Sequence, residues 1–214
     1  MAEGKKPYPV SLSVDYPDRE LNRLTSFFRL IVIIPIAFLL CLVSGAAWES
    51  GKGHQWVVNL SAGGVLFLAT MLMLVFKRKY PRWWFDWNIA LTKFGARVGA
   101  YLALLRDEYP STDEDQAVHI EIPYPDAKKD LNQWLPLVKW FLAIPHYIIL
   151  FVLGIAAIFV MIIAWFAILF TGRYPKGFFD FVVGVMRWSL RVIAYAALLT
   201  TDEYPPFTLR EQAL

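Results

Sequence analysis

Four basic residues on two predicted helices, together with one histidine, have the types and spacing that could do chemistry. Lys93 and Arg97 stand four residues apart, and Arg187 and Arg191 repeat that spacing later in the chain. At roughly 100° per residue, each pair falls on one narrow face of a helix. The same face carries an acid, a small residue and a tyrosine in both helices: Asp86, Ala90 and Tyr101, then Asp180, Gly184 and Tyr195. Such a stripe predicts binding of lipid phosphates or another anion.

His146 follows Pro145 within a long apolar run, and a histidine at membrane depth is a candidate for proton transfer. The competing interpretation is a structural hydrogen bond, which is favoured because no other metal-ligating side chain lies at ligand spacing. The sequence shows no Gly-rich phosphate loop and no serine nucleophile motif. The single Cys41 can form neither an intramolecular disulfide nor a thiol metal cluster. We therefore expect no enzyme, no metal and no cofactor.

The composition indicates a membrane protein. Hydrophobic residues make up 57% of the 214-residue chain, aromatic residues 16% and charged residues only 18%, and the mean hydropathy is +0.45. A soluble globular domain carries more charge than this. The formal net charge of +3 is too small to predict a nucleic-acid partner.

Three uncharged runs predict the helices that enter the bilayer. Leu30 to Trp48 and Val57 to Phe76 span 19 and 20 residues, which suits about 30 Å of hydrocarbon. Trp140 to Phe170 spans 31 residues. We predict that this third run forms a second hairpin that turns at Gly154, with Lys139 snorkelling to the interface. The alternative is a single tilted or kinked helix with its kink at Pro145.

Basic residues border both ends of each predicted hairpin. They are Arg19, Arg23 and Arg29 before the first, Lys77, Arg78, Lys79 and Arg82 after it, Lys128, Lys129 and Lys139 before the second, and Arg173 and Lys176 after it. By the positive-inside rule both hairpins open toward the cytoplasm, which also places both termini there.

The chain reads as a tandem duplication, with residues 1–110 and 118–214 as repeats and 111–117 as the linker. Leu21-Asn22 and Leu131-Asn132 stand at equal distances before Ile34-Pro35 and Ile144-Pro145, and each half closes on Asp-Glu-Tyr-Pro. Equal charge sidedness predicts a parallel repeat. An alternating stretch before each hairpin, Val10 to Val14 and Val118 to Ile122, predicts a short β-strand.

Each hairpin is followed by an amphipathic stretch of helical length, Trp83 to Leu105 and Gly177 to Leu199. Two basic residues near mid-helix disfavour a third span, since each costs about 2.5–3.5 kcal/mol at the bilayer centre. We predict helices that lie in the cytoplasmic interface with their basic stripe toward lipid phosphates. Burial of these helices inside the protein is the alternative.

Four motifs of the second half carry a family resemblance: Phe141 to His146, Trp165 to Pro175, Arg187 to Arg191 and Thr201 to Phe207. They closely resemble the bacterial membrane family catalogued as domain of unknown function 4389. The segment Ile120 to Leu209 looks like a near-complete copy of the unit of that family, and the first half looks like a divergent copy with Ile36 in place of His146. The resemblance implies an integral membrane protein and no particular activity.

The expected fold class is therefore an all-α integral membrane protein. It has two parallel tandem repeats, each a transmembrane hairpin followed by an amphipathic interfacial helix, with short strands before each repeat. The expected location is the bacterial plasma (inner) membrane.

The expected function is a non-enzymatic scaffold or accessory subunit that presents a basic, aromatic cytoplasmic surface to anionic lipid or a partner protein. The alternative is an oligomeric channel or transporter that favours anions. An enzyme acting on lipid ranks third. Expected partners are membrane lipids and a membrane protein or further copies of the chain.

Overall fold

The computed structural model describes residues 8–36, 38, 62–112, 114 and 116–211. Its first half contains β1 (Ser11–Val14), α1 (Arg23–Phe27), α2 (Arg29–Val32), α4 (Ala62–Lys77) and α5 (Arg82–Leu102). Its second half contains β2 (Val118–Glu121), α6 (Pro136–Leu142), α7 (Ile144–Thr171) and α8 (Lys176–Ala196). The described chain is thus mostly helical with two short strands, as the sequence predicts.

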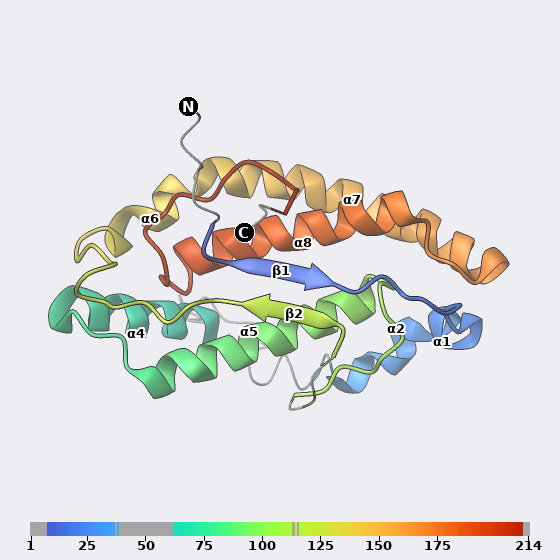
Figure 1. The fold of residues 1–214 in the computed structure, drawn as a ribbon, viewed down its shortest axis with the longest axis horizontal. Helices are drawn as coiled ribbons and strands as arrows, with labels where there is room; N and C mark the ends of the chain where they lie inside the picture. The colour runs from blue at the N-terminus through green and yellow to red at the C-terminus, as the bar shows by residue number, and fades with distance from the viewer. Residues whose placement is uncertain (1–7, 37, 39–61, 113, 115, 212–214) are drawn as a thin grey trace, which may run out of the picture.

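The two strands form one antiparallel ladder in the middle of the molecule (Figure 1). Leu12 lies opposite Ile120, and Val14 lies opposite Val118. Burial alternates along both strands, so these four side chains share the face that packs on the core. Strand β1 contacts α8 of the second half, whereas β2 contacts α5 of the first half. The halves are therefore intertwined.

The hairpin predicted at Gly154 is wrong, because α7 continues through Gly154 as one helix of 28 residues. A single glycine in a helix costs only about 1 kcal/mol, whereas a turn there would leave backbone groups unpaired among apolar side chains. The helix ends at Gly172, whose φ of 73° is left-handed and suits glycine. Pro145 stands in the first turn of α7, where it is tolerated, and α6 precedes it with only Ala143 between them.

Among the described residues, α7 alone is long and apolar enough to cross a bilayer. The four predicted spans are therefore not found in the described part of the chain. Most of the first predicted span, the loop after it and residues 57–61 of the second predicted span lie outside the described residues.

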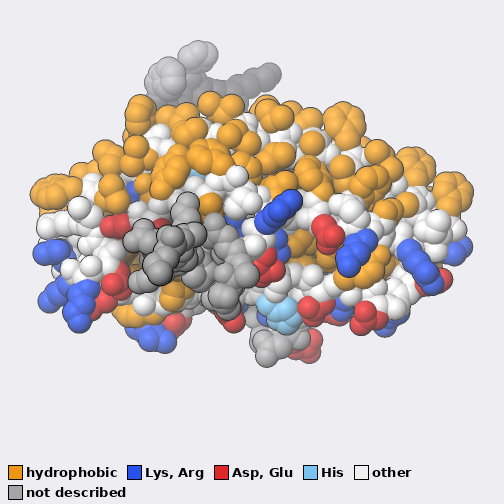
Figure 2. Space-filling view, turned by 45° about the horizontal axis from the view of Figure 1, so that its top comes forward, with side chains coloured by type: hydrophobic (Ala, Val, Ile, Leu, Met, Phe, Trp, Pro, Cys, Tyr) orange, Lys and Arg blue, Asp and Glu red, His pale blue; other side chains and the backbone are white. Residues whose placement is uncertain are grey.

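Helix α7 has one buried face and one exposed face, and both are apolar apart from His146 on the buried one. His146, Ala157, Ala164 and Ile168 are buried. The opposite side exposes Ile148, Phe151, Val152, Ile155, Phe159, Ile162, Ile163, Phe166 and Phe170. Neighbouring helices add exposed Phe27, Leu30 and Ile31 from α1 and α2, and Leu137, Trp140 and Phe141 from α6. We call these side chains together the apolar face. Figure 2 shows hydrophobic side chains gathered along one side of the molecule, with the charged ones below them.

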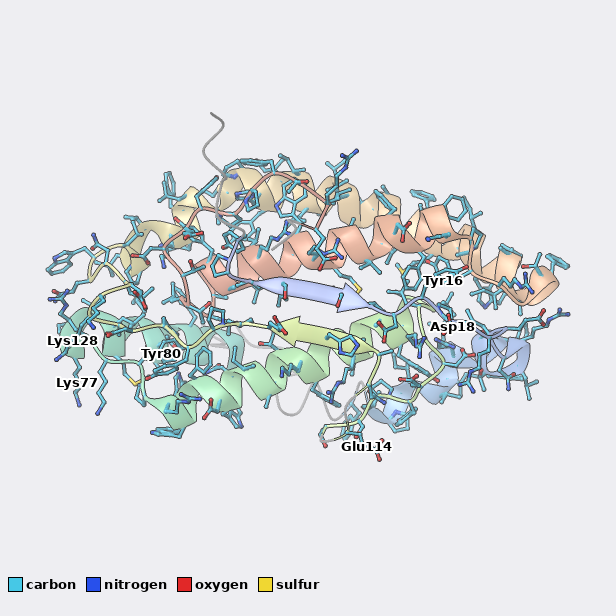
Figure 3. The ribbon with its side chains drawn as sticks, viewed as in Figure 1. Tyr16, Asp18, Lys77, Tyr80, Glu114 and Lys128 are labelled. Atoms are coloured by element: carbon cyan, nitrogen blue, oxygen red, sulfur yellow. The ribbon has the colours of Figure 1, made fainter. Side chains whose placement is uncertain are left out.

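Two tyrosine hydroxyls join the halves at opposite ends of the molecule. One belongs to Tyr16 and the other contacts Tyr80, and Figure 3 labels both residues. The Tyr16 hydroxyl donates to the carbonyl of Tyr174, at 2.5 Å, in the turn between α7 and α8. The Tyr124 hydroxyl donates to the carbonyl of Tyr80, in the turn between α4 and α5. Each Tyr-Pro-Asp segment therefore bonds to a Tyr-Pro turn of the other half.

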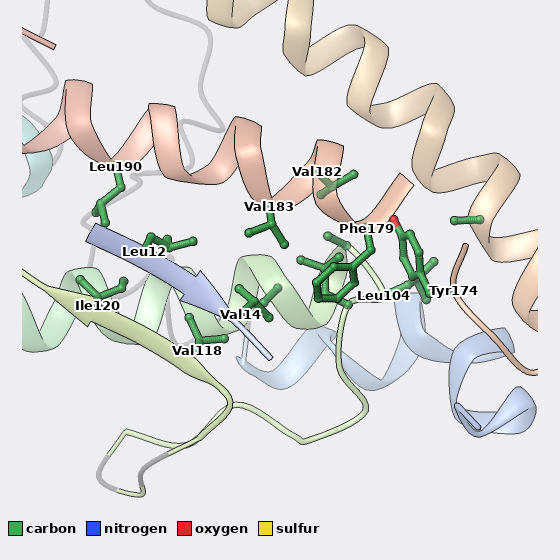
Figure 4. Packing of buried hydrophobic residues seen from close by; sticks show 14 of the residues in the cluster. Leu12, Val14, Leu104, Val118, Ile120, Tyr174, Phe179, Val182, Val183 and Leu190 are labelled. Carbon is green, nitrogen blue, oxygen red and sulfur yellow. The ribbon is translucent and has the colours of Figure 1, made fainter. Parts of the chain in front are cut away.

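The main core lies between the ladder, α8 and α7. Figure 4 shows Leu12 and Val14 of β1 beneath Val183 and Leu190 of α8, with Phe179 near the start of that helix. Helix α8 is consequently buried on most of its surface. The prediction that its apolar face sinks into the membrane interface is wrong, because α7 and β1 cover that face. The alternative, burial inside the protein, is correct for α8.

The C-terminal segment packs so closely on α8 that one glycine is required there. A Cβ atom at Gly184 would approach Leu209 Cβ to 2.9 Å and its carbonyl oxygen to 3.0 Å. We expect Gly184→Ala to lower stability by about 1–3 kcal/mol through overpacking. Thermal unfolding followed by circular dichroism in mild detergent measures the change in Tm.

The matched control for this substitution is Gly95→Ala in α5. Nothing lies within 4 Å of a Cβ at Gly95, so this change should raise stability by up to about 1 kcal/mol. Equal Tm values for the two variants would contradict the close packing on α8.

Candidate functional site

The arginines of the α8 stripe point into the protein. Arg191 is 2% exposed, and its two Nη atoms donate to the carbonyls of Thr208 and Arg210, both at 3.2 Å. Arg187 donates from Nε to the carbonyl of Leu12 at 2.8 Å. It also donates from Nη1 to the carbonyl of Leu209 at 3.1 Å. These arginines fasten the C-terminal segment and β1 to α8.

Of the two basic residues of the α5 stripe, only one is buried in the protein. Arg97 is buried and donates to the carbonyl of Ser111 at 2.9 Å, whereas Lys93 is half-buried. The expectation of an outward-facing basic stripe is therefore wrong for the three arginines. Sequence spacing placed them on one helix face, but it could not reveal that backbone carbonyls of distant segments cover that face.

The structure gives His146 a structural hydrogen bond. Its Nδ1 accepts from the indole Nε1 of Trp188 at 3.1 Å. Its ring stacks on Phe207 with centroids 4.1 Å apart and lies 4.8 Å from the ring of Tyr204. Within the described residues no group of three or more His, Cys, Asp or Glu side chains could hold a metal ion. His146 thus anchors the Tyr204–Phe207 segment against α7 and α8.

The strongest electrostatic feature is a buried ion pair in the second half. Lys139 is fully buried, and its Nζ lies 2.6 Å from Asp202 Oδ1. The same Nζ donates to the carbonyl of Thr201 at 2.7 Å and lies 5.1 Å from the ring centroid of Tyr195. Burial lowers the pKa of Lys139, and the hydrogen bond and charge of Asp202 oppose this shift. The prediction that Lys139 snorkels to the interface is therefore wrong.

A second buried ion pair occupies the corresponding place in the first half. Arg29 pairs with Asp107 and donates from Nη1 to the carbonyls of Tyr101 and Arg106, at 2.7 and 2.6 Å. Its guanidinium carbon lies 4.3 Å from the ring centroid of Tyr101. In both halves the cation thus contacts an aspartate, the backbone carbonyl just before that aspartate, and a tyrosine ring.

The second oxygen of each carboxylate binds a backbone amide. Asn22 N donates to Asp107 Oδ2 at 2.7 Å, and Asn132 N donates to Asp202 Oδ2 at 2.5 Å. Each aspartate therefore joins three places in the chain: the Leu-Asn step, the basic residue after it and the closing Asp-Glu-Tyr-Pro motif. Sequence reasoning noted these motifs but missed their contact. The available signal was that both halves place the basic residue at the same distance after the Leu-Asn step and end on the same closing motif.

Comparison with known proteins gives a family match within the second half. Residues 136–208 match the model of a family described as Domain of unknown function (DUF4389), which confirms the predicted resemblance for this segment. No curated protein and no solved structure matches the chain. The matched segment contains both members of the Lys139–Asp202 pair, His146 and the arginines of α8.

Removing one partner of a buried ion pair leaves the other charge uncompensated. We expect Asp202→Asn to lower the free energy of unfolding by about 3–5 kcal/mol, because Lys139 then has no counter-charge. Asp107→Asn should act similarly through Arg29. Chemical denaturation in detergent, monitored by circular dichroism, gives the size of the loss.

Glu203→Gln is the control for the Asp202 substitution. Its side chain is exposed, and the contact of this residue with the Tyr8 hydroxyl uses its backbone carbonyl. The control should change stability by less than about 0.5 kcal/mol. A loss in Glu203→Gln as large as that in Asp202→Asn would show that the ion pair is not what holds this segment.

Proposed function

We propose that the protein is a non-enzymatic scaffold or accessory subunit of the bacterial inner membrane. In this proposal the apolar face lies in the cytoplasmic leaflet, and the charged side of the molecule faces the cytoplasm and a partner protein. The apolar face is the observation that carries the proposal. Contiguous exposed apolar surface of this extent is expected at a membrane or protein interface.

The supporting contrast is between the two sides of the molecule. The exposed side of α7 carries no charged residue along its whole length, whereas Lys, Arg, Asp and Glu side chains gather on the other side (Figure 2). Trp83, Trp134 and Trp140 are exposed on α5, before α6 and on α6. Tryptophan favours the boundary between lipid and water, so these positions suit a protein seated in one leaflet.

We infer further that α7 lies along the membrane rather than across it. Its 28 residues extend roughly 42 Å at about 1.5 Å per residue, which exceeds a hydrocarbon core of about 30 Å. Exposed basic residues stand on both sides of the α6–α7 segment, Lys128 and Lys129 before it and Arg173 and Lys176 after it. Because basic residues favour the cytoplasmic side, both ends of the segment belong there.

In this proposal, exposed basic residues outside the α5 and α8 stripes bind the lipid phosphates that the sequence predicts for those stripes. Lys77 ends α4, and Arg78 and Lys79 follow it. Arg173 stands between α7 and α8, and Lys176 begins α8. Each such charge near an anionic surface is worth about 1 kcal/mol. The arginines of the stripe instead bind carbonyls of their own chain, so their arrangement gives no support to an anion channel.

The strand register supports a duplicated chain. Leu12 and Ile120 are matching positions of the two alternating stretches, and each is the ladder partner of the other. Such self-pairing is what a two-fold axis through the ladder produces. We therefore propose two repeats related by an axis that passes between these residues and lies along the membrane normal.

Thiol labelling in intact cells tests how α7 is placed. Lys129→Cys and Arg173→Cys, each in a Cys41→Ser background, put a thiol at exposed positions on either side of the α6–α7 segment. With α7 along the cytoplasmic leaflet, neither thiol reacts with an impermeant maleimide until the membrane is permeabilised. Reaction of one of them in intact cells would mean that α7 crosses the bilayer.

The scaffold role is tested by what accompanies the protein out of the membrane. Purification in mild detergent followed by native mass spectrometry should yield the chain with a stoichiometric protein partner. The control is the same purification of a variant with Lys128→Glu and Lys129→Glu. These changes should weaken binding of the partner protein but should not change how much of the chain is extracted from the membrane. A symmetric homo-oligomer that conducts anions in planar bilayers would overturn the scaffold proposal in favour of a channel.

A further inference from the structure

An apolar crevice of about 440 Å³ lies between α7 and the short helices α1 and α2. Its walls are mainly the side chains of Phe27, Leu30, Ile158, Ile162 and Phe166. Each of these five side chains is also exposed and belongs to, or borders, the apolar face. The crevice therefore opens on the side of the molecule that we place in the acyl region of the membrane.

Two buried polar groups stand among these apolar walls. Ser26 and Arg29 line the crevice and are 1% and 2% exposed. Within the part of the chain that the structure describes, Ser26 Oγ and Arg29 Nε have no hydrogen-bond partner. A buried polar atom without a partner costs about 1–3 kcal/mol, so two of them in one crevice call for a ligand atom.

The chemistry of the two groups selects the kind of ligand atom. Arg29 Nε carries a hydrogen to donate, and the serine hydroxyl can donate as well. The ligand atom is therefore a hydrogen-bond acceptor. Since the charge of Arg29 is already balanced by Asp107, a second buried carboxylate would lack a counter-charge. A neutral carbonyl oxygen satisfies both requirements.

We propose that this crevice binds one acyl chain of a membrane phospholipid, with the ester carbonyl of the lipid accepting from Arg29 Nε and Ser26 Oγ. The hydrocarbon of that chain lies along Ile158, Ile162 and Phe166 of α7. This inference rests on the proposed seating of the apolar face in a leaflet, which supplies the lipid. A pocket of a few hundred Å³ with apolar walls and few polar groups is typical of small-molecule sites.

Trp165 offers a reporter inside the crevice. Its indole Nε1 donates to the carbonyl of Ser26 at 3.1 Å, and its ring stacks on Phe27 with centroids 6.0 Å apart. The side chain also lines the crevice. Its fluorescence is therefore sensitive to a heavy atom carried on a bound acyl chain.

Two neighbouring isoleucines of α7 provide a matched pair of variants. Ile162 lines the crevice and Ile163 does not, yet their exposures are similar, 49% and 53%. Ile162→Trp should fill the crevice, whereas Ile163→Trp adds the same bulk outside it. Both variants keep the apolar character of the face, so neither should impair membrane association or folding.

Native mass spectrometry of protein purified in mild detergent and incubated with phosphatidylcholine measures the retained lipid. We expect one retained phospholipid on wild type and on Ile163→Trp, and at least tenfold lower occupancy on Ile162→Trp. Phosphatidylcholine with brominated acyl chains should quench wild type more strongly than Trp165→Phe. An equivalent free fatty acid should compete weakly.

Three results would overturn the lipid site. They are no lipid retained by wild type, equal retention by the two tryptophan variants, and a fatty acid that displaces phosphatidylcholine at equal concentration. Flotation of the same variants with liposomes reports separately on the proposed function. Normal flotation with no retained lipid removes the site alone, whereas loss of flotation in wild type removes the membrane proposal itself.

Discussion

A buried cation facing a carboxylate is the interaction on which the structure depends. The Lys139–Asp202 pair joins α6 to the segment after α8, and the Arg29–Asp107 pair joins α2 to the segment after α5. In each pair a backbone carbonyl binds the cation and a backbone amide binds the carboxylate. Groups of the protein itself therefore take the place of water around both charges. Because each cation needs both its aspartate and its carbonyls, the entry and exit of each half are fixed relative to one another.

Arginine side chains also bind backbone carbonyls along α8. A guanidinium has five donors in a fixed geometry, and it can bind several backbone carbonyls that no strand or helix satisfies. Arg187 and Arg191 do this for β1 and for the chain near Thr208. Backbone carbonyls in irregular segments usually bind water. In a protein with one apolar side, the arginine donors bind these carbonyls instead.

Features with a local cause could be predicted from the sequence, and features that depend on distant contacts could not. Alternation predicted strands close to β1 and β2, and helical spacing predicted helices close to α5 and α8. The prediction of a hairpin at Gly154 was wrong because an uncharged run has the same composition whether it forms a turn or one continuous helix. The stripe was placed on the correct helix faces, but its environment was misjudged, since the covering carbonyls lie as far away in sequence as Leu12 is from Arg187.

The exchange of strands between halves has a consequence for how such a chain can exist. Strand β1 packs on α8, β2 packs on α5, and Leu12 pairs with Ile120, its counterpart in the proposed repeat. A polypeptide with one half alone would expose an unpaired strand edge and an uncovered helix. It would have to assemble as a two-fold homodimer in which the central strand residue meets its own copy. Under the proposed duplication, joining two such subunits in one chain makes that association independent of protein concentration. It also lets matching positions carry different residues, such as Ile36 and His146.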